Sequence, residues 1–197
     1  MKYILLILLV SIIKFEFAYC NDFRGDLLKF NISTNVNSLS VGDHLIVTLD
    51  IENKTGEDLF FAHSRLEKNF IVSFLGSNSN QLRWFTNTIF ARFPTKTIDD
   101  FLFVPNNTMK TVQYKFILLK RKQWLNDLQL NYDGLYLFDE PMGAYYILLY
   151  KEREIKIQCE WEISADTIEY FDKVLQGKKQ FEQKVSSNII KIKIAEP

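Results

Sequence analysis

Apolar residues recur at every second position along several short segments of the chain. In residues 45–51 every odd-numbered position is apolar, and Thr48 and Asp50 lie between them. The same alternation recurs in residues 28–32, 70–74, 112–118 and 190–194. Successive side chains of a strand point to opposite faces, whereas a helix repeats every 3.6 residues. The period of two therefore predicts β-strands with one face in a core and the other in water.

Turn-forming residues separate these segments. Gly, Asn, Asp, Ser and Pro gather in residues 38–43, 53–58, 76–80 and 105–107. Further short apolar segments lie at residues 81–85, 89–93, 101–104 and 145–157. Many short strands bounded by turns predict an all-β fold, an antiparallel immunoglobulin-like β-sandwich. Residues 53–58 are expected to form a hairpin-type connection in which Gly56 adopts a positive φ.

Two stretches are predicted to be short helical insertions between strands. Residues 120–130 and residues 165–175 have apolar side chains at helical spacing, and Ser164 or Asp166 can cap the second stretch. No repeat or linker divides the remainder of the chain. We therefore expect one β-sandwich domain over residues 21–197.

Residues 1–20 have the pattern of a secretory signal peptide. Lys2 supplies the positive start, residues 3–13 form the apolar run, and small residues precede a cleavage position before Asn21. The apolar run is about half of the roughly 20 residues that span a bilayer, so a membrane anchor is the weaker interpretation. We predict a secreted or periplasmic protein with no integral membrane segment after leader removal.

The two cysteines have different interpretations. Cys20 ends the leader, and if it is retained it can be the acylated first residue of a lipoprotein, although Tyr19 is bulky for that motif. Cys159 lies in an apolar segment and is expected to be a buried packing residue. The sequence has no clustered ligands at zinc or calcium spacing, so we predict no metal and no cofactor.

Charge balance restricts the class of partner. The chain has 24 Lys and Arg against 24 Asp and Glu, and removal of the leader leaves 22 against 23, a net charge of −1. Such a chain has no long-range attraction to nucleic acid, so we predict no nucleic-acid partner. Hydrophobic residues make up 47% of the chain, which excludes a disordered protein.

The N-terminal half of the chain resembles two families. Residues 41–43 (VGD), the alternating strand after them and residues 52–55 (ENKT) resemble the first hairpin of many exported immunoglobulin-like domains. They are also similar to the bacterial intracellular proteinase inhibitor family, in which an asparagine turn precedes a strand and an R-W-x-x-x-x-x-F segment. Arg83, Trp84 and Phe90 occupy the corresponding positions here. That resemblance implies protease inhibition through an exposed loop, although the inhibitor family is cytosolic.

The C-terminal part resembles the G-x-Y…Y…W-x-G-x-x-x-S-N ending of uncharacterised exported β-sandwich proteins of bacteria. Residues 141–145 (PMGAY), Tyr150, Gly177 and residues 187–188 (SN) carry this resemblance. The chain departs from the pattern at residues 175–176 (LQ), where the tryptophan is missing. The resemblance implies a fold rather than an activity.

The sequence gives little support to catalysis. Its two histidines are His44 and His63, and His63 is adjacent to Ser64. Neighbouring residues of a strand point to opposite faces, so His63 is poorly placed to activate that serine. The acidic pairs at residues 99–100 and 139–140 are expected to be solvated loop residues rather than glycosidase carboxylates. We predict that the protein is not an enzyme.

Two kinds of short motif and one further group of residues remain as candidate sites. Residues 24–26 (RGD) match an integrin-binding tripeptide, and a polar lead-in to the first strand is the simpler interpretation. Residues 31–33, 53–55 and 106–108 match the N-glycosylation acceptor, which applies to a eukaryotic secreted protein, whereas in a bacterium they are turn residues.

The candidate binding residues form the remaining group. Aromatic side chains can make a platform for sugars or a partner peptide, and they can equally fill a core. The candidates are Arg83, Trp84, Trp124 and Trp161.

These observations lead to three hypotheses about function. The first is an uncharacterised, exported, non-enzymatic protein of the envelope or extracellular space that binds an unknown protein or glycan. The second is a proteinase inhibitor that presents an exposed loop, residues 76–80 or 92–95. The third is a carbohydrate-binding module.

Overall fold

The structure is a computed structural model. It describes residues 27–62, 70–76, 79–82, 84–86, 101–125, 130–139, 143–148, 153–161, 175 and 184–195. These residues are nearly all in strands, with almost no helix, which confirms the all-β prediction. The strands are β1 Leu28–Thr34, β2 Ser38–Leu39, β3 His44–Asn53, β4 Leu59–Ala62, β5 Phe70–Leu75, β6 Trp84–Thr86, β7 Phe101–Val104, β8 Thr108–Leu125, β9 Leu130–Asp139, β10 Ala144–Leu148, β11 Glu154–Trp161, β12 Val185–Ser186 and β13 Ile190–Ile194.

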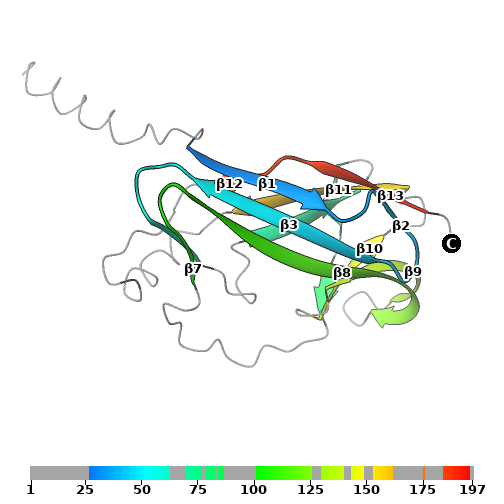
Figure 1. Cartoon of the computed structure of the whole chain (residues 1–197). Helices are drawn as coiled ribbons and strands as arrows, with labels where there is room; N and C mark the ends of the chain where they lie inside the picture. Colours follow the sequence, from blue (N-terminus) through cyan, green and yellow to red (C-terminus); the bar gives the residue numbers. More distant parts are fainter. Residues whose placement is uncertain are drawn as a thin grey trace, which may run out of the picture.

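The described strands form three sheets (Figure 1). The largest has the order β1-β3-β8-β9-β10-β6 and curls into a half-barrel. The second has the order β12-β11-β13-β2, with β5 also paired to β11, and β4 and β7 form a two-stranded ribbon. The described pairs are antiparallel except β13–β2, which is parallel. In Figure 1, β1, β3 and β8 lie side by side, with β11 behind them.

The alternation in the sequence decides which face of each sheet turns inward. In β3 the odd-numbered residues 45 to 53 are buried, and the residues between them are less so. The register places Leu49 of β3 beside Ile32 of β1 and Val112 of β8, so apolar rows continue from strand to strand. In β11 the odd-numbered residues 155 to 161 are buried in the same way. A shift of the strand register by one residue would turn each row of apolar side chains toward water, so the alternation specifies one register.

Side chains from all three sheets pack into one hydrophobic core. The ring of Phe61, in the β4–β7 ribbon, lies 5.9 Å from Phe30 of β1 and 5.2 Å from Trp161 of β11. Phe74 of β5 lies 4.9 Å from Phe116 of β8. Aromatic pairs of this kind contribute about 0.5–1.5 kcal/mol beyond their burial. The two sheets and the ribbon are therefore cross-linked by aromatic rings.

The connection between β3 and β4 differs from the predicted hairpin. β3 pairs with β1 and β8, whereas β4 pairs with β7, so residues 54–58 pass from one sheet to another. Gly56 does adopt a positive φ of 89°, as predicted. The hairpin prediction is wrong because alternation and turn residues locate two strands without identifying their partners.

The predicted helix over residues 120–130 is also wrong. β8 continues to Leu125 and β9 begins at Leu130, and the two strands pair in register up to their ends. Apolar spacing over so short a stretch fits a helix or a strand, and pairing with a neighbouring strand overrides local propensity. Of the second predicted helix, only Leu175 is described, and it is helical and buried in the core.

Other predictions are confirmed in part. Strands lie where 101–104 and 112–118 were predicted, whereas the long apolar segment 145–157 is divided between β10 and β11. The leader, Cys20 and the segment 89–93 lie outside the described residues. Within the ranges given above, the structure has no helix that could span a membrane.

Candidate functional site

The candidate binding tryptophans do not form one platform. Arg83 lies outside the described residues, and Trp84 begins β6. The register across β10 and β9 aligns Trp84 with Leu118 of β8. Trp124 follows Leu118 by six positions on the same strand, which is roughly 20 Å along an extended chain. Trp84 and Trp124 therefore belong to different parts of the largest sheet.

Trp161 lies in the core. It ends β11, none of its surface is exposed, and its ring meets that of Phe61 at an interplanar angle of 84°. A ring with no exposed face cannot stack on a sugar or a peptide. The structure thus corrects the candidate binding role of Trp161, and the alternative interpretation, core packing, describes this residue.

Ser187 and Asn188 join the second sheet to the largest one. Ser187 Oγ accepts a hydrogen bond from Cys159 N of β11 (2.9 Å), and Ser187 N donates to Cys159 O (2.8 Å). Asn188 Oδ1 accepts from Ile32 N of β1 (2.7 Å), and Asn188 Nδ2 donates to Ile32 O (3.1 Å). β1 is an edge strand of its sheet. The Asn188 amide makes, at Ile32, the two backbone hydrogen bonds that a neighbouring strand would otherwise make. We call these two residues the Ser187–Asn188 clasp.

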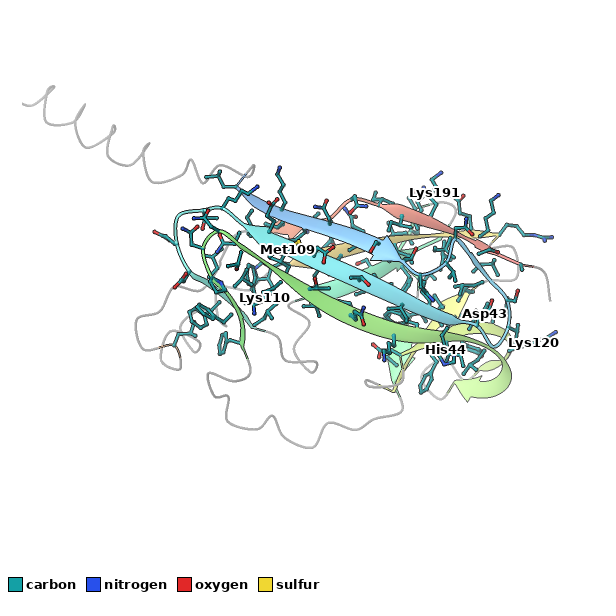
Figure 2. All side chains as sticks on the ribbon, in the orientation of Figure 1. Asp43, His44, Met109, Lys110, Lys120 and Lys191 are labelled. Carbon is teal, nitrogen blue, oxygen red and sulfur yellow. The ribbon has the colours of Figure 1, made fainter. Side chains whose placement is uncertain are left out.

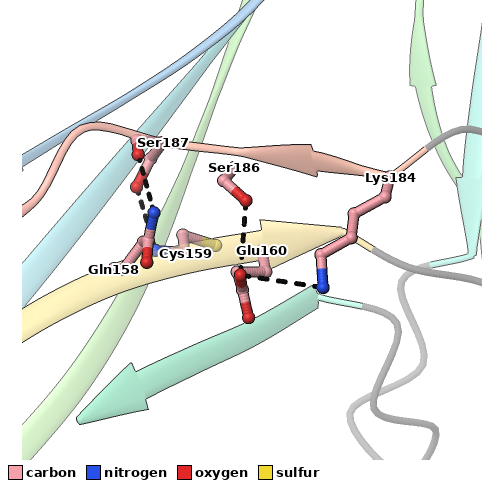
Figure 3. Close-up of polar contacts among 6 residues, drawn as sticks. All are labelled: Gln158, Cys159, Glu160, Lys184, Ser186 and Ser187. Carbon is pink, nitrogen blue, oxygen red and sulfur yellow. Dashed lines mark hydrogen bonds and ion pairs between the residues drawn. The ribbon is translucent and has the colours of Figure 1, made fainter. Parts of the chain in front are cut away.

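Polar side chains beside the clasp attach β12 to β11 (Figure 3). Ser186 Oγ donates to Glu160 Oε1 (3.3 Å), and Lys184 Nζ lies 3.9 Å from the same oxygen. Gln158 Nε2 donates to Ser187 O (3.2 Å). Exposed ion pairs contribute at most about 1 kcal/mol. This group therefore positions a strand and contains no arrangement for reaction chemistry.

The core contains polar side chains that stay neutral. Burial, followed by the nearby Glu160 carboxylate, raises the pKa of the Cys159 thiol to about 12. Burial and then Asp139 raise the pKa of Tyr146 to about 12. Burial, followed by Cys159 and Asp139, raises the pKa of Tyr114 well above its usual value. A protonated, buried thiol is not a nucleophile, so Cys159 is the packing residue that its sequence context predicted.

The residues that could support catalysis are not brought together where the structure describes them. His44 begins β3 and is exposed, and Asp139 is buried at the end of β9. His63, Ser64 and the segments 24–26 and 99–100 lie outside the described residues, as does Glu140. No group of three or more potential metal ligands occurs in the described ranges.

The three N-glycosylation matches have different surroundings. Asn53 is fully buried, and its Nδ2 donates to Glu57 O and to Val104 O, both at 2.9 Å. Asn106 is half-buried, and its Oδ1 accepts from a backbone N–H of the neighbouring connection (3.0 Å). Asn31 is exposed on β1. Asn53 is thus a structural residue that fixes the β3–β4 connection against the end of β7.

Beyond the body of the largest sheet, β8 and β9 continue as a two-stranded extension. β3 pairs with β8 only as far as Ile117, and β10 pairs with β9 only as far as Leu135. Residues 121–125 and 130–134 pair only with each other among the described strands. In Figure 1 the end of β8 curls round at this point. We call these two segments the β8–β9 arm.

Sequence reasoning missed the structural roles of Asn53 and Asn188. Both residues belonged to patterns that the sequence analysis singled out, in 53–55 and 187–188, but the patterns do not show which backbone groups the amides meet. The arm was missed for a different reason. Residues 120–122 are all basic, so the alternation of apolar and polar residues that marks the other strands is absent there.

Comparison of the chain with protein-family models, with curated proteins and with solved structures finds no match. The function is therefore argued from the residues and the structure alone.

Proposed function

We propose that the protein is an exported, non-enzymatic binding protein with an immunoglobulin-like β-sandwich fold, which acts through its surface on a protein or a glycan. The observation that carries this proposal is the single core shared by all three sheets. A scaffold closed in this way holds its turns and outward faces in fixed positions, which suits recognition. The leader pattern of residues 1–20 supports a location in the cell envelope or the extracellular space.

Two features support the sandwich assignment. The clasp ties β1, at the edge of one sheet, to β11 in the other, so the layers are joined along that side. β2 pairs with β13, the last strand, so segments from both ends of the domain lie in one sheet. An arrangement of two sheets with a common aromatic core agrees with the resemblance to exported immunoglobulin-like domains.

Protease inhibition is a second candidate, and the loop after β5 favours it. Gly76 N donates to Asn80 O (2.9 Å), and Ser79 N donates to Gly76 O (2.8 Å). Lys156 Nζ of β11 donates to Ser79 Oγ (2.7 Å). A loop whose ends are held in this way loses little conformational freedom on binding, which is what an inhibitory loop requires. The other candidate loop, residues 92–95, lies outside the described residues.

Export can be tested with the full chain. We expect a host with a secretory pathway to release or translocate the protein, and the intact mass of the exported form to equal that of residues 21–197. A larger mass that includes a lipid on Cys20 would support the lipoprotein alternative. Retention in the cytoplasm at the mass of the full chain contradicts the proposed location.

Binding can be separated from the two competing activities. We expect the exported protein to show no hydrolase activity, and to leave a broad protease panel unaffected at micromolar concentration. Hydrolysis that disappears in a His63→Ala variant would refute the non-enzymatic proposal. Inhibition of one protease that is lost on replacing Lys156 by Ala, with folding retained, would establish the inhibitor function instead, because Lys156 holds the loop at Ser79.

A further inference from the structure

The first half of β8 has a neighbouring strand on one side only. β3 pairs with β8 over residues 108–117, whereas β9 pairs with the other side of β8 only from residue 116 onward. Among the described strands, none pairs with that other side over residues 109–115, and β7, which precedes β8, pairs with β4 instead (Figure 1). Figure 2 shows Lys110 at this end of the strand and Lys120 at the other. We call residues 109–115 the open edge of β8.

The hydrogen bonds of Leu118 show which backbone groups face the open edge. Leu118 O accepts from Gly42 N (2.7 Å), and Leu118 N donates to Asp43 O (3.0 Å), so the even-numbered residues of β8 bond toward β3. Backbone groups alternate in direction along a strand, so those of the odd-numbered residues 109 to 115 point toward the open edge. Within the described part of the chain, this edge therefore presents a row of unpaired donors and acceptors, the groups that bind an added strand.

The inward face of β8 is less buried beside the open edge. Phe116 and Leu118, which lie where β9 pairs with the strand, are 2% and 0% exposed. Val112 and Tyr114 lie on the same face beside the open edge, and they are only half-buried against the core. An added strand would place its own side chains over these two residues. The open edge thus borders apolar surface that a further strand can bury, and such burial is favourable.

Two lysines give the open edge a positive charge. Lys110 and Lys115 are exposed, and neither makes an ion pair within the described residues. β8 has no acidic residue over 108–120, and the two acids of β3, Asp50 and Glu52, each have a partner. A strand that pairs with this edge therefore meets a positive charge near each end.

We propose that the open edge of β8 binds an extended, acidic segment of a partner protein, which pairs antiparallel to β8 as an added strand. This inference rests on the proposed binding function and names its partner class. The edge backbone groups hold the segment, its apolar side chains cover Val112 and Tyr114, and its acids meet Lys110 and Lys115. A second copy of the chain fits less well, because two open edges placed side by side bring the lysines of both copies together.

Amide hydrogen exchange tests whether the edge is open in the exported protein. We expect the amides of Thr111 and Gln113 to exchange rapidly, and those of Val112 and Tyr114, which point toward β3, to exchange slowly. Slow exchange at Thr111 and Gln113 would show that the edge already has a partner, and would overturn the proposal.

The binding probe is a synthetic peptide, Glu-Val-Thr-Val-Thr-Glu, capped at both ends. In the antiparallel register its glutamates lie opposite Lys110 and Lys115, and its valines lie opposite the two half-buried residues between them. We expect the peptide to shift the amide NMR signals of residues 111–115 and to leave that of Ile32, on the clasped edge, unchanged. A peptide with lysine in place of both glutamates should bind about tenfold more weakly. Equal affinity for the two peptides would overturn the acidic assignment.

A pair of variants tests the two lysines. The edge variant carries Lys110→Gln and Lys115→Gln, and the matched control carries Lys29→Gln and Lys193→Gln, two exposed residues of β1 and β13. We expect the dissociation constant of the acidic peptide to rise about tenfold in the edge variant and to stay within about twofold of wild type in the control. Equal weakening in both would show attraction to net charge alone and would overturn the proposal. Circular dichroism confirms that both variants are folded.

A Gln113→Pro variant tests the backbone of the edge. It removes one N–H from the open edge and leaves the pairing with β3 in place, because the Gln113 amide points away from β3. We expect this variant to fold and to lose peptide binding, and unchanged binding would overturn the added strand. A concentration-dependent dimer in analytical ultracentrifugation that Gln113→Pro abolishes would assign the edge to a second copy instead. No binding of either peptide would also overturn the proposal, whereas export is tested separately by the mass measurement described above.

Discussion

The clasped side of the molecule and the β8–β9 arm use the same structural unit, a β-strand, in opposite ways. On the clasped side, β1 is an edge strand, but the Asn188 amide bonds to Ile32 and closes that edge. The arm begins at Arg121, beyond the pairing of β8 with β3, and pairs only with itself among the described strands. An edge that is closed by side chains contributes to stability, and one that is left open is available for recognition. The difference predicts that replacements on the clasped side lower the stability of the fold, and that those on the arm change it little.

The largest effect on stability is expected from Trp161→Ala. The residue is fully buried at the end of β11, where its ring packs against Phe61, so its removal leaves a cavity in the core. We expect the free energy of unfolding in urea to fall by about 3–5 kcal/mol. Trp124→Ala, in the arm, is the matched comparison and should cost far less. Similar losses at the two positions would show that the arm is part of the core.

Asn53→Ala should have the next largest effect. The replacement removes the donors to Glu57 O and Val104 O, and it also removes the Oδ1 that accepts from Thr55. We expect a loss of about 2–3 kcal/mol in the free energy of unfolding. Asn31→Ala, at an exposed position of β1, is the control and should change the value by less than about 0.5 kcal/mol. Equal effects at Asn31 and Asn53 would remove the reason to call Asn53 structural.

Alkaline pH should destabilise the clasped side through Cys159. Burial raises the pKa of this thiol to about 12 in the folded protein, against about 8.5 in an unfolded chain. Because the folded-state pKa is the higher one, the stabilisation is complete below about pH 8.5 and is lost as the pH rises toward 12. We expect a loss of about 1–2 kcal/mol between pH 7 and pH 10, measured by urea unfolding.

The Cys159→Ala variant supplies the control for this effect. It has no thiol to ionise, so its stability should change less over the same pH interval. Tyr146, whose pKa burial and Asp139 raise to about 12, has an ordinary value of 10.0 and accounts for a further loss only above that pH. A thiol reagent should modify the wild-type protein slowly when folded and rapidly in urea. Rapid modification of the folded protein would contradict the buried placement of Cys159.

The sequence predicted the strands of the clasped side well, because one face of each is in water. In β1 and β3 every second residue is buried, and the alternation that results is visible without a structure. It did not identify strand partners: residues 53–58 are predicted to form a hairpin-type connection, and the structure shows that this segment connects two sheets. Partner choice depends on long-range contacts such as that of Phe61 with Trp161, which local pattern does not contain.

The arm was not predicted because its residues lack that alternation. Residues 120–122 are all basic, so the sequence shows no apolar face for a strand at this point. The spacing of Trp124 and Leu125 favours a helix instead. The candidate site was foreseen only in part for a related reason. A sequence shows that a residue is aromatic, but it does not show whether the side chain fills a core, as that of Trp161 does, or lies on the surface.

Asn188→Ala should cost about 1 kcal/mol, less than the changes above, because it removes two hydrogen bonds at a half-buried edge. Urea unfolding measures the loss, and faster hydrogen exchange at the Ile32 amide should accompany it, since that N–H loses its acceptor. Ser186→Ala removes an exposed hydroxyl that donates to Glu160 and is the control. An unchanged exchange rate at Ile32 in the Asn188 variant would show that the clasp does not close the edge.

The smallest effect on stability is expected from a variant that carries Lys120→Gln, Arg121→Gln and Lys122→Gln, at the base of the β8–β9 arm. These residues lie where β8 has left β3 and pairs only with β9, so their replacement should change the free energy of unfolding by less than about 0.5 kcal/mol. The same unfolding measurement decides whether the two regions are separate. If this variant loses as much stability as Asn188→Ala, the arm belongs to the folded body. If its stability is unchanged, the arm is a part of the sheet that the core does not require.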